Sequence, residues 1–434
     1  ACNGGVRSPS LYGQVPSGDV TELDTSRNIV VGVAGGIAAY KACHLVRNFK
    51  EAGDDVRVVP TENALNFVGA ATFEALSGHP VSTTVFDAVD EVQHVNVGQH
   101  ADVVVIAPAT ADLIARLATG RADDLLTSTV LVATCPVIVA PAMHTEMWLN
   151  PATQDNVATL RRRGITVIEP AHGRLTGADS GPGRLPEPDQ IAEVVRTELA
   201  GYRVEHRWKG KKVVISAGGT REELDPVRYL GNRSSGRQGF ALAEWACQMG
   251  ADVTIVAGNT ASLPVPSGAK VRSIISTREL EQAMREEARD ADVVIMAAAV
   301  SDFRPAEVAE SKMKKGQADD VLSTLHLVEN PDVLKGLVAA RDRAELPAEC
   351  VIVGFAAETG DADKSALEYA QEKFARKGCD VIMANEVGRD KTFGQKSNEG
   401  WILRSGLEPQ RVEHGSKQVV AAQILAAVNE MLRD

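Results

Sequence analysis

The stretch Ser216-Ala-Gly-Gly-Thr-Arg-Glu-Glu-Leu-Asp-Pro-Val-Arg-Tyr-Leu-Gly-Asn-Arg-Ser-Ser-Gly-Arg-Gln-Gly239 organises the second half of the chain. It follows an apolar run at 213–215, which predicts a buried strand, and precedes residues 240–249, which predict a helix ended by Gly250. Glycines between a strand and a helix let backbone N–H groups approach an anion, and arginines add bidentate contacts. A loop of this length is uncommon in a compact domain unless it is functional, so an anion-binding loop is favoured over a flexible connection.

Composition narrows the class of protein. The 434 residues have room for two or three domains, and abundant alanine, valine and glycine are typical of α/β layers. A formal net charge of −12 without a basic stripe disfavours nucleic-acid binding, and no apolar run is long enough to cross a membrane. The six cysteines are scattered, which predicts reduced thiols in a cytoplasmic protein. Residues 1–27 lack periodicity and predict a disordered extension.

Strands and helices alternate through residues 28–199. Strands are expected at 28–34, 56–59, 102–108 and 136–140, with helices at 35–52 and 191–199 and after residues 61, 109 and 124. Gly35 and Gly36 do not form a GxGxxG pattern, so on their own they indicate close helix–strand packing as readily as ligand binding. Thr61 can cap a helix or bind a phosphate, and capping is the commoner use. The polar groups of interest follow strands, where open α/β sheets bind ligands.

The alternation returns after residue 211. Strands are expected at 252–257, 271–275, 292–297, 350–355 and 380–385. Thr277 and Asn330 are each expected to cap a helix, and Lys373 and Lys377, four residues apart, share one helix face. The segment 200–210 has mixed charge and no periodicity, so it predicts a linker. The expected fold is α/β, with two Rossmann-like domains of mainly parallel sheets at 28–199 and 211–434.

One motif pair carries a family resemblance. Asp225-Pro-Val-Arg-Tyr229 followed by Asn232-Arg-Ser-Ser-Gly236 resembles phosphopantothenate–cysteine ligase, the second half of the bifunctional coenzyme A biosynthesis proteins. The resemblance covers about residues 211–434. It implies that CTP activates 4'-phosphopantothenate as an acyl-cytidylate, from which the amine of L-cysteine displaces CMP. Asn232 would handle that intermediate, and Lys312 with Mg²⁺ or Mn²⁺ would stabilise phosphate charge; the metal ligands stay unassigned. The implied nucleotide and substrate site comprises Arg228, Met296, Ala297, Ala298, Asp302, Lys312, Pro331, Asp332, Val333, Leu334, Phe355, Lys373 and Lys377.

The first half resembles FMN-dependent cysteine decarboxylases over about residues 28–190. The matching motifs are Gly35-Gly-Ile-Ala-Ala-Tyr-Lys41, Pro108-Ala-Thr-Ala-Asp-Leu113 and Pro141-Ala-Met143 with Met147. This resemblance implies decarboxylation of 4'-phosphopantothenoylcysteine to 4'-phosphopantetheine. His94 aligns with the family's catalytic histidine; without the resemblance, a lone histidine is more often structural. The implied FMN site comprises Gly35, Gly36, Ile37, Thr61, Pro108, Thr110 and Met143.

Two positions depart from the decarboxylase pattern. His144 stands where the family usually has asparagine, and both side chains can donate a hydrogen bond to a substrate carboxylate. Gly177 stands where the family has a flap cysteine that protonates the enethiolate left by carbon dioxide. Thr176, Asp179 and water are open alternatives for that acid, and so is a half that binds FMN but decarboxylates poorly.

The resemblance also implies trimers of the flavin domain and dimers of the ligase domain, which together give a dodecamer. Two other functions stay open. A nicotinamide-dependent reductase with two nucleotide-binding domains is disfavoured, because no GxGxxG is followed by an acidic residue about twenty positions on. The second is a non-catalytic flavin-binding electron carrier fused to a binding module.

Overall fold

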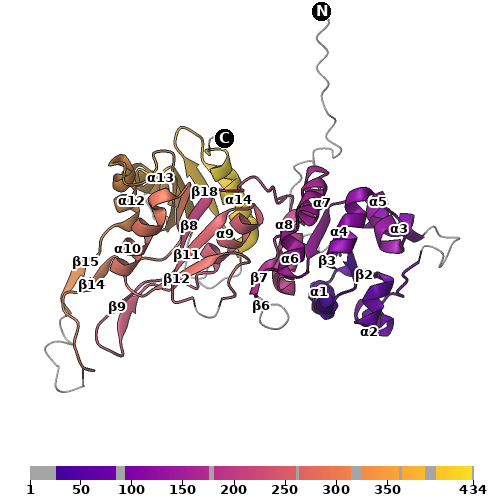
Figure 1. The fold of residues 1–434 in the computed structure, drawn as a ribbon. Coiled ribbons are helices and arrows are strands. Elements are labelled where there is room, and N and C mark those ends of the chain that lie inside the picture. The colour runs from indigo at the N-terminus through magenta and orange to yellow at the C-terminus, as the bar shows by residue number, and fades with distance from the viewer. Residues whose placement is uncertain are drawn as a thin grey trace, which may run out of the picture.

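Two α/β bodies lie side by side in the computed structural model (Figure 1). The structure describes residues 26–84, 93–174, 180–260, 263–313, 325–360, 364–386 and 397–432. Nearly all of the predicted disordered extension, 1–27, falls outside these residues. Within them, no helix has the length and apolar character needed to cross a membrane. The cysteines of the described ranges, Cys43, Cys135, Cys247, Cys350 and Cys379, are free thiols.

The first body is built on a parallel five-stranded sheet in the order β2-β1-β3-β4-β5. All seven residues of β3 are buried, because helices cover both faces of the sheet. One apolar core joins the sheet to α1, α2 and α8, and the other joins it to α3, α4, α5 and α7. The strands are β1 (Asn28–Val33), β2 (Asp55–Pro60), β3 (Val103–Ala109), β4 (Val137–Pro141) and β5 (Thr166–Val167). The helices are α1 (Tyr40–Glu51), α2 (Ala70–Ser77), α3 (Gln93–His100), α4 (Ala111–Thr119), α5 (Leu125–Val132), α6 (Thr145–Leu149), α7 (Pro151–Arg162) and α8 (Pro188–Leu199).

The second body has an eight-stranded sheet in the order β12-β11-β8-β13-β16-β17-β18-β19. Its first six strands are parallel, and β18 and β19 add an antiparallel edge that the sequence did not predict. Helices α9 and α14 cover one face and α10, α12 and α13 the other. The strands are β8 (Lys212–Gly218), β11 (Asp252–Gly258), β12 (Lys270–Ile274), β13 (Val293–Met296), β16 (Val351–Glu358), β17 (Val381–Glu386), β18 (Ser397–Arg404) and β19 (Gln410–Ser416). The helices are α9 (Arg237–Gln248), α10 (Thr277–Glu287), α12 (Val333–Asp342), α13 (Ala366–Lys377) and α14 (Lys417–Asn429).

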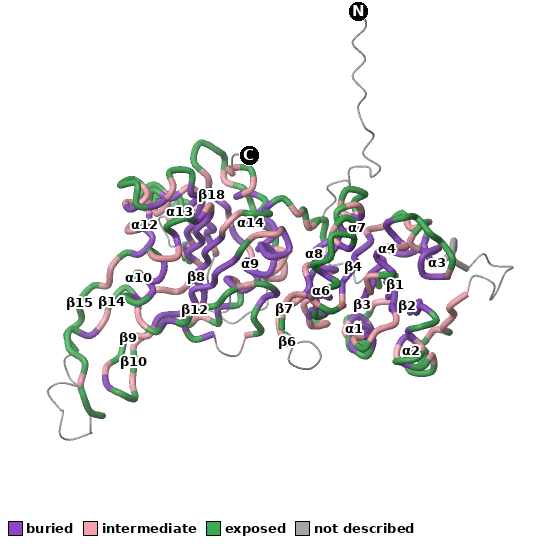
Figure 2. The backbone as a smooth tube through the Cα atoms, in the orientation of Figure 1, coloured by how far each residue is buried: buried purple, intermediate pink, exposed green. Residues whose placement is uncertain are grey.

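Two pairs of short strands extend from the second body (Figure 1). One pairs β9 (Arg221–Glu223) with β10 (Tyr229–Gly231), and the other pairs β14 (Phe303–Pro305) with β15 (Leu327–Glu329). We call these four strands, together with the turn 224–228 that joins β9 to β10, the arm. Figure 2 shows that much of the arm is exposed. Its exposed apolar side chains include Val227, Tyr229, Phe303, Leu327 and Val328.

A polar seam joins the two bodies. Gln190 of α8 and Gln248 of α9 both donate to the carboxylate of Glu244, at 2.9 and 3.1 Å. The Gln248 amide oxygen accepts from the backbone N–H of Glu169 at 2.8 Å. Burial raises the pKa of Glu244, although the amide hydrogen bonds oppose this shift. No helix or strand occupies residues 200–211, all of which are described, and the domain boundary there stays a prediction.

Two of the predicted helix caps are wrong, whereas Thr61 does cap its short helix by accepting from the Ala64 N–H. Ser276 caps α10 by accepting from the Glu279 N–H at 3.3 Å, and Thr277 instead turns its hydroxyl inward. Asp332 caps α12, and Asn330 bonds elsewhere. In both places a neighbouring residue supplies the cap, because tertiary hydrogen bonds occupy the predicted side chain.

Candidate nucleotide and flavin sites

Both sheets have a point where the direction of strand addition reverses. It lies between β1 and β3 in the first sheet and between β8 and β13 in the second. Open α/β sheets bind ligands in the crevice at the carboxyl ends of strands at such a point. The Gly35–Gly36 turn of the implied FMN site follows Val33, and the predicted anion-binding loop continues after Gly218, so they leave β1 and β8 at these two points.

A cavity of about 910 Å³ opens at the reversal point of the second sheet. Its size is in the range of small-molecule sites. Most of the predicted nucleotide residues line it, together with Arg233, Ser301 and Arg376, which were not predicted. The predicted residues in its lining are Asn232, Met296, Ala298, Asp302, Pro331, Asp332, Val333, Leu334, Phe355, Lys373 and Lys377.

Two lysines of α13 give the cavity its positive side. Lys373 donates to Glu358 at 2.9 Å and Lys377 to Asp332 at 2.6 Å. Burial opposes ionisation of Asp332, but the hydrogen bond from Lys377 holds the pKa of Asp332 below its ordinary value. These carboxylates hold both ammonium groups beside the cavity. A polyphosphate in the cavity could replace the carboxylates as the partner of the two lysines.

The floor of the cavity is the irregular segment 297–302 between β13 and β14. The backbone N–H of Ala298 donates to the Ser216 hydroxyl at 3.1 Å, and that of Ala299 donates to the Gly218 carbonyl at 2.8 Å. The Asn232 side-chain amide donates to the Val300 carbonyl at 2.9 Å. Asn232 is therefore held against the floor by its amide nitrogen.

A smaller cavity of about 190 Å³ continues the first one toward the start of α9. Ser234, Ser235 and Arg237 line it, and so do Lys417 and Asn398, which come from distant segments. Asn398 is 5% exposed, and its side-chain oxygen has no partner among the described residues. Burial lowers the pKa of Lys417. A helix start, small hydroxyls and a lysine together favour an anion, as the opening stretch predicts.

Gly218 leaves no room for a side chain at this site. It has φ +82°, and a Cβ there would lie 1.7 Å from the Gly258 carbonyl oxygen. Gly218→Ala is therefore expected to destabilise the second body by at least about 3 kcal/mol, through strain and a backbone clash. Gly406 has φ +74° but open space around it, so Gly406→Ala should cost only about 1 kcal/mol. Thermal unfolding of the two variants compares them, and equal shifts in melting temperature would contradict the clash.

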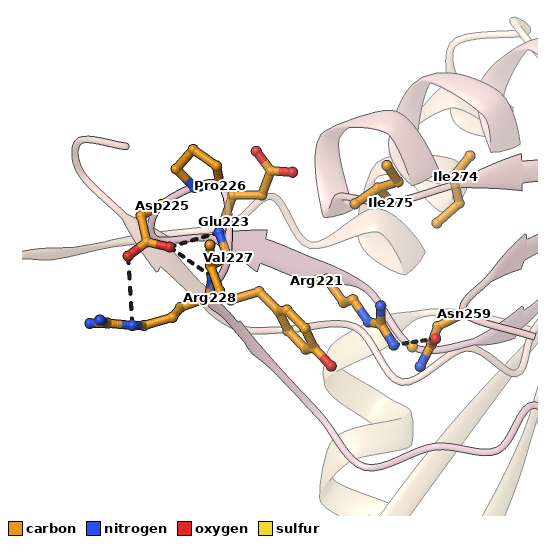
Figure 3. Close-up of a pocket in the computed structure, with 11 residues that line it drawn as sticks. Arg221, Glu223, Asp225, Pro226, Val227, Arg228, Asn259, Ile274 and Ile275 are labelled. Carbon is orange, nitrogen blue, oxygen red and sulfur yellow. Dashed lines mark hydrogen bonds and ion pairs between the residues drawn. The ribbon is translucent and has the colours of Figure 1, made fainter. Parts of the chain in front are cut away.

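Arg228, Ala297 and Lys312 do not line the large cavity, and Ala297 lines the smaller one instead. Arg228 instead lines a cavity of about 330 Å³ with Asp225, Tyr229 and Asn259 (Figure 3). Its guanidinium donates to the Met313 carbonyl at 2.8 Å, and the Met313 N–H donates to Asp225 at 3.3 Å. Burial opposes ionisation of Asp225, but backbone N–H groups hold its pKa below the ordinary value. The turn from Asp225 to Arg228 thus tethers the segment that carries the exposed Lys312.

Four of the predicted flavin residues, Gly35, Gly36, Pro108 and Thr110, lie where β1 and β3 end at the reversal point of the first sheet. A Cβ on Gly35 would lie 2.5 Å from the Cβ of Asn63, so this turn touches the short helix after β2 that Thr61 caps. A Cβ on Gly36 would meet only the Thr110 methyl carbon, at 3.7 Å, which leaves the backbone open to a ligand. Ile37 beside it is 73% exposed. Pro108 accepts from the Ala34 N–H at 3.0 Å. A backbone cradle of this kind fits the phosphate and ribityl chain of a flavin nucleotide.

The segment 173–184, which the resemblance makes the flap, is described only at its two ends, which belong to the hairpin of β6 (Ala171–Arg174) and β7 (Ser180–Arg184). The Met143 N–H donates to the Gly183 carbonyl at 2.9 Å, so the flap lies against the Pro-Ala-Met segment. A Cβ on Gly183 would be 2.3 Å from the Met143 carbonyl oxygen. His144 is exposed at the start of α6.

Several predicted residues of the decarboxylase chemistry cannot be placed. Thr176, Gly177 and Asp179 lie outside the described residues. His94 lies on α3, but its side chain is also outside them. The roles of these residues therefore stay predictions.

Residues 208–432 match the family model for the DNA/pantothenate metabolism flavoprotein C-terminal domain, and residues 17–200 match the flavoprotein family model. The chain is 57% identical over 412 residues to the coenzyme A biosynthesis bifunctional protein CoaBC of Mycolicibacterium smegmatis, covering 95% of this chain and 99% of that protein. It is 56% identical to the protein of that name from Mycobacterium tuberculosis, over 93% of this chain and 96% of the relative. A solved structure of the FMN-dependent cysteine decarboxylase SpaF is 34% identical over 39% of this chain and 99% of its own, with a TM-score of 0.34. With two matched domains in this order and a relative 57% identical over 95% of its length, the chain belongs to the family of bifunctional coenzyme A biosynthesis proteins.

Proposed function

We propose that the chain joins 4'-phosphopantothenate to L-cysteine at the expense of CTP and then decarboxylates 4'-phosphopantothenoylcysteine to 4'-phosphopantetheine. Membership of the family supports both activities. The observation that carries the CTP step is the 910 Å³ cavity, which brings Asn232 together with Lys373 and Lys377.

In the proposed ligation, a carboxylate oxygen of 4'-phosphopantothenate attacks the α-phosphorus of CTP, and pyrophosphate leaves. The cysteine nitrogen then attacks the acyl carbon, loses a proton and displaces CMP. Lys373 and Lys377 lie where they could stabilise the phosphate charge. Asn232 is a neutral amide, so it can hold the acyl carbonyl without competing as a nucleophile.

A divalent cation is part of the proposal, as Mg²⁺ or Mn²⁺. The described residues contain no group of three or more His, Cys, Asp or Glu side chains that could hold a metal. Asp302 and Asp332 line the cavity and offer the oxygen ligands that Mg²⁺ prefers, in addition to the phosphates. The ion would supply charge neutralisation at the phosphates.

In the proposed decarboxylation, FMN supplies the transient oxidation and later re-reduction of the substrate thiol. Gly36 and Thr110, whose methyl carbon would lie 3.7 Å from a Cβ on Gly36, would hold the flavin together with Gly35, Thr61 and Met143. His94 would act as the base, and His144 would donate a hydrogen bond to the substrate carboxylate.

We also propose a cytoplasmic homo-oligomer in which the arm forms a dimer contact. Val227 is 61% exposed and Phe303 is 48% exposed, and apolar side chains gathered on one projection mark an interaction surface. Trimers of the first body would complete a dodecamer.

The test supplies the purified protein with CTP, 4'-phosphopantothenate and cysteine. Pyrophosphate and carbon dioxide should both be released, and the protein should absorb near ~450 nm through bound flavin. A nicotinamide-dependent reductase predicts no flavin band, and an electron carrier predicts no pyrophosphate. A colourless protein without CTP-dependent amide formation would refute the proposal.

A further inference from the structure

A buried carboxylate lies behind the floor of the nucleotide cavity. Glu222, the central residue of β9, is 4% exposed. One of its oxygens accepts two hydrogen bonds from Thr277, from the backbone N–H at 2.9 Å and from the hydroxyl at 2.7 Å. Thr277 is fully buried. A buried carboxylate needs hydrogen-bond donors, so this pair forms a fixed unit.

Two sets of hydrogen bonds connect the Glu222–Thr277 pair to residues that line the cavity. The hydroxyl oxygens of Thr277 and Thr220 lie 3.1 Å apart in a hydrogen bond, and the Thr220 hydroxyl accepts from the Ser301 N–H at 3.0 Å. The Asn330 side-chain amide lies 3.3 Å from the Thr277 hydroxyl and donates to the Ser301 carbonyl at 2.9 Å. The Asn330 backbone N–H donates to the Asp302 carbonyl at 2.8 Å. Both backbone polar groups of Ser301 and the carbonyl of Asp302 are thus held by residues that meet at Thr277.

The carboxylate sets the direction of these hydrogen bonds. A threonine hydroxyl has one proton and two lone pairs, and the Glu222 carboxylate is its strongest acceptor. With the proton on that side, the lone pairs of Thr277 face Thr220 and the Asn330 amide. Without the hydroxyl, Asn330 loses one of its partners.

We propose that Glu222 is a positioning residue for nucleotide binding, which acts through Thr277 and Asn330 on the backbone at Ser301 and Asp302. Ser301, Asp302 and Asn330 line the 910 Å³ cavity. Asn330 leads directly into Pro331–Leu334, which line the same cavity. This inference rests on the proposed CTP-dependent ligation.

Loss of the Thr277 hydroxyl is expected to affect only nucleotide binding. The preceding floor residues are held independently, because Ala298 bonds Ser216, Ala299 bonds Gly218, and Val300 bonds Asn232. Loss of the Thr277 hydroxyl therefore removes a hydrogen-bond partner from Thr220 and from Asn330, which hold Ser301 and Asp302, and leaves Asn232 in place. The KM for CTP should rise while kcat changes little.

The test compares two variants of the full chain that differ by one hydroxyl. Thr277→Val should raise the KM for CTP about tenfold, whereas Thr277→Ser should stay within about threefold of wild type. For both, kcat and the KM for cysteine should change less than about threefold. Carbon dioxide release from supplied 4'-phosphopantothenoylcysteine reports on the other body and should not change.

A second pair tests the carboxylate itself. Glu222→Gln keeps an oxygen that can accept both Thr277 hydrogen bonds and should preserve the KM for CTP, whereas Glu222→Leu should raise it about tenfold. If the wild type is active and the two Thr277 variants have the same KM for CTP, the inference is overturned. A fall in kcat without a rise in the KM for CTP would also overturn it, and so would an equal KM for CTP in the two Glu222 variants. A wild type that releases no pyrophosphate with CTP would instead refute the proposed function.

Discussion

Asn232→Asp is expected to lower ligase turnover on the order of 100-fold and to let the acyl-cytidylate accumulate. The Asn232 amide donates to the Val300 carbonyl at 2.9 Å, and a carboxylate cannot donate that hydrogen bond. A negative charge there would also face the acyl carbonyl and the nucleotide phosphate. Attack on CTP is carried by phosphate-binding groups, so the first step should persist. Quenched single-turnover reactions analysed by mass spectrometry would measure the intermediate.

The matched control is Asn259→Asp. Asn259 lines the neighbouring cavity, and its side-chain oxygen accepts from Arg221, an interaction that aspartate keeps. Ligase turnover in this variant should stay within about twofold of wild type, because no contact to the floor is lost. Full turnover in Asn232→Asp, without any accumulated intermediate, would remove Asn232 from its proposed role.

His94→Gln should reduce carbon dioxide release by about 10²- to 10⁴-fold and leave pyrophosphate release intact. Glutamine can form hydrogen bonds but cannot accept a proton near neutral pH. The helix that carries residue 94, α3, packs closely against α5. A Cβ on Gly98 would lie 2.7 Å from the Thr129 carbonyl oxygen, so α3 and α5 are in close contact. Supplying 4'-phosphopantothenoylcysteine directly isolates this step.

His100→Gln controls for the loss of an imidazole from the same helix. His100 is the last residue of α3 and is exposed. Decarboxylation in this variant should stay close to wild type. If the two variants lost activity equally, the effect would belong to α3 as a whole and the role of His94 as a base would be wrong.

Much of the fold could be predicted from the sequence, because buried parallel strands are continuous apolar runs and ligand loops follow them. The predicted strand Val213–Ile215 lies within β8, and most nucleotide residues line one cavity. The antiparallel strands β18 and β19 had no comparable pattern. The participation of Lys417 and Asn398 could not be predicted either, since only the folded sheet brings these distant residues together.

The two incorrect caps have a common physical cause. Thr277 and Asn330 fit the local preference for capping residues, but both make tertiary hydrogen bonds behind the nucleotide cavity. Local patterns cannot include partners such as Glu222, which is 55 residues from Thr277. Local rules therefore failed where buried tertiary hydrogen bonds occupy the side chains of the predicted caps.

The seam between the bodies restricts how such a protein can be recombined. Glu244 is enclosed by one amide from its own helix and one from the other body, Gln190. A hybrid with a foreign first half would bury that carboxylate without one of its donors, which is unfavourable. A hybrid made from the halves of two relatives therefore needs Gln190, Glu244 and Gln248 together. If the halves were expressed separately, each would expose its polar side of the seam.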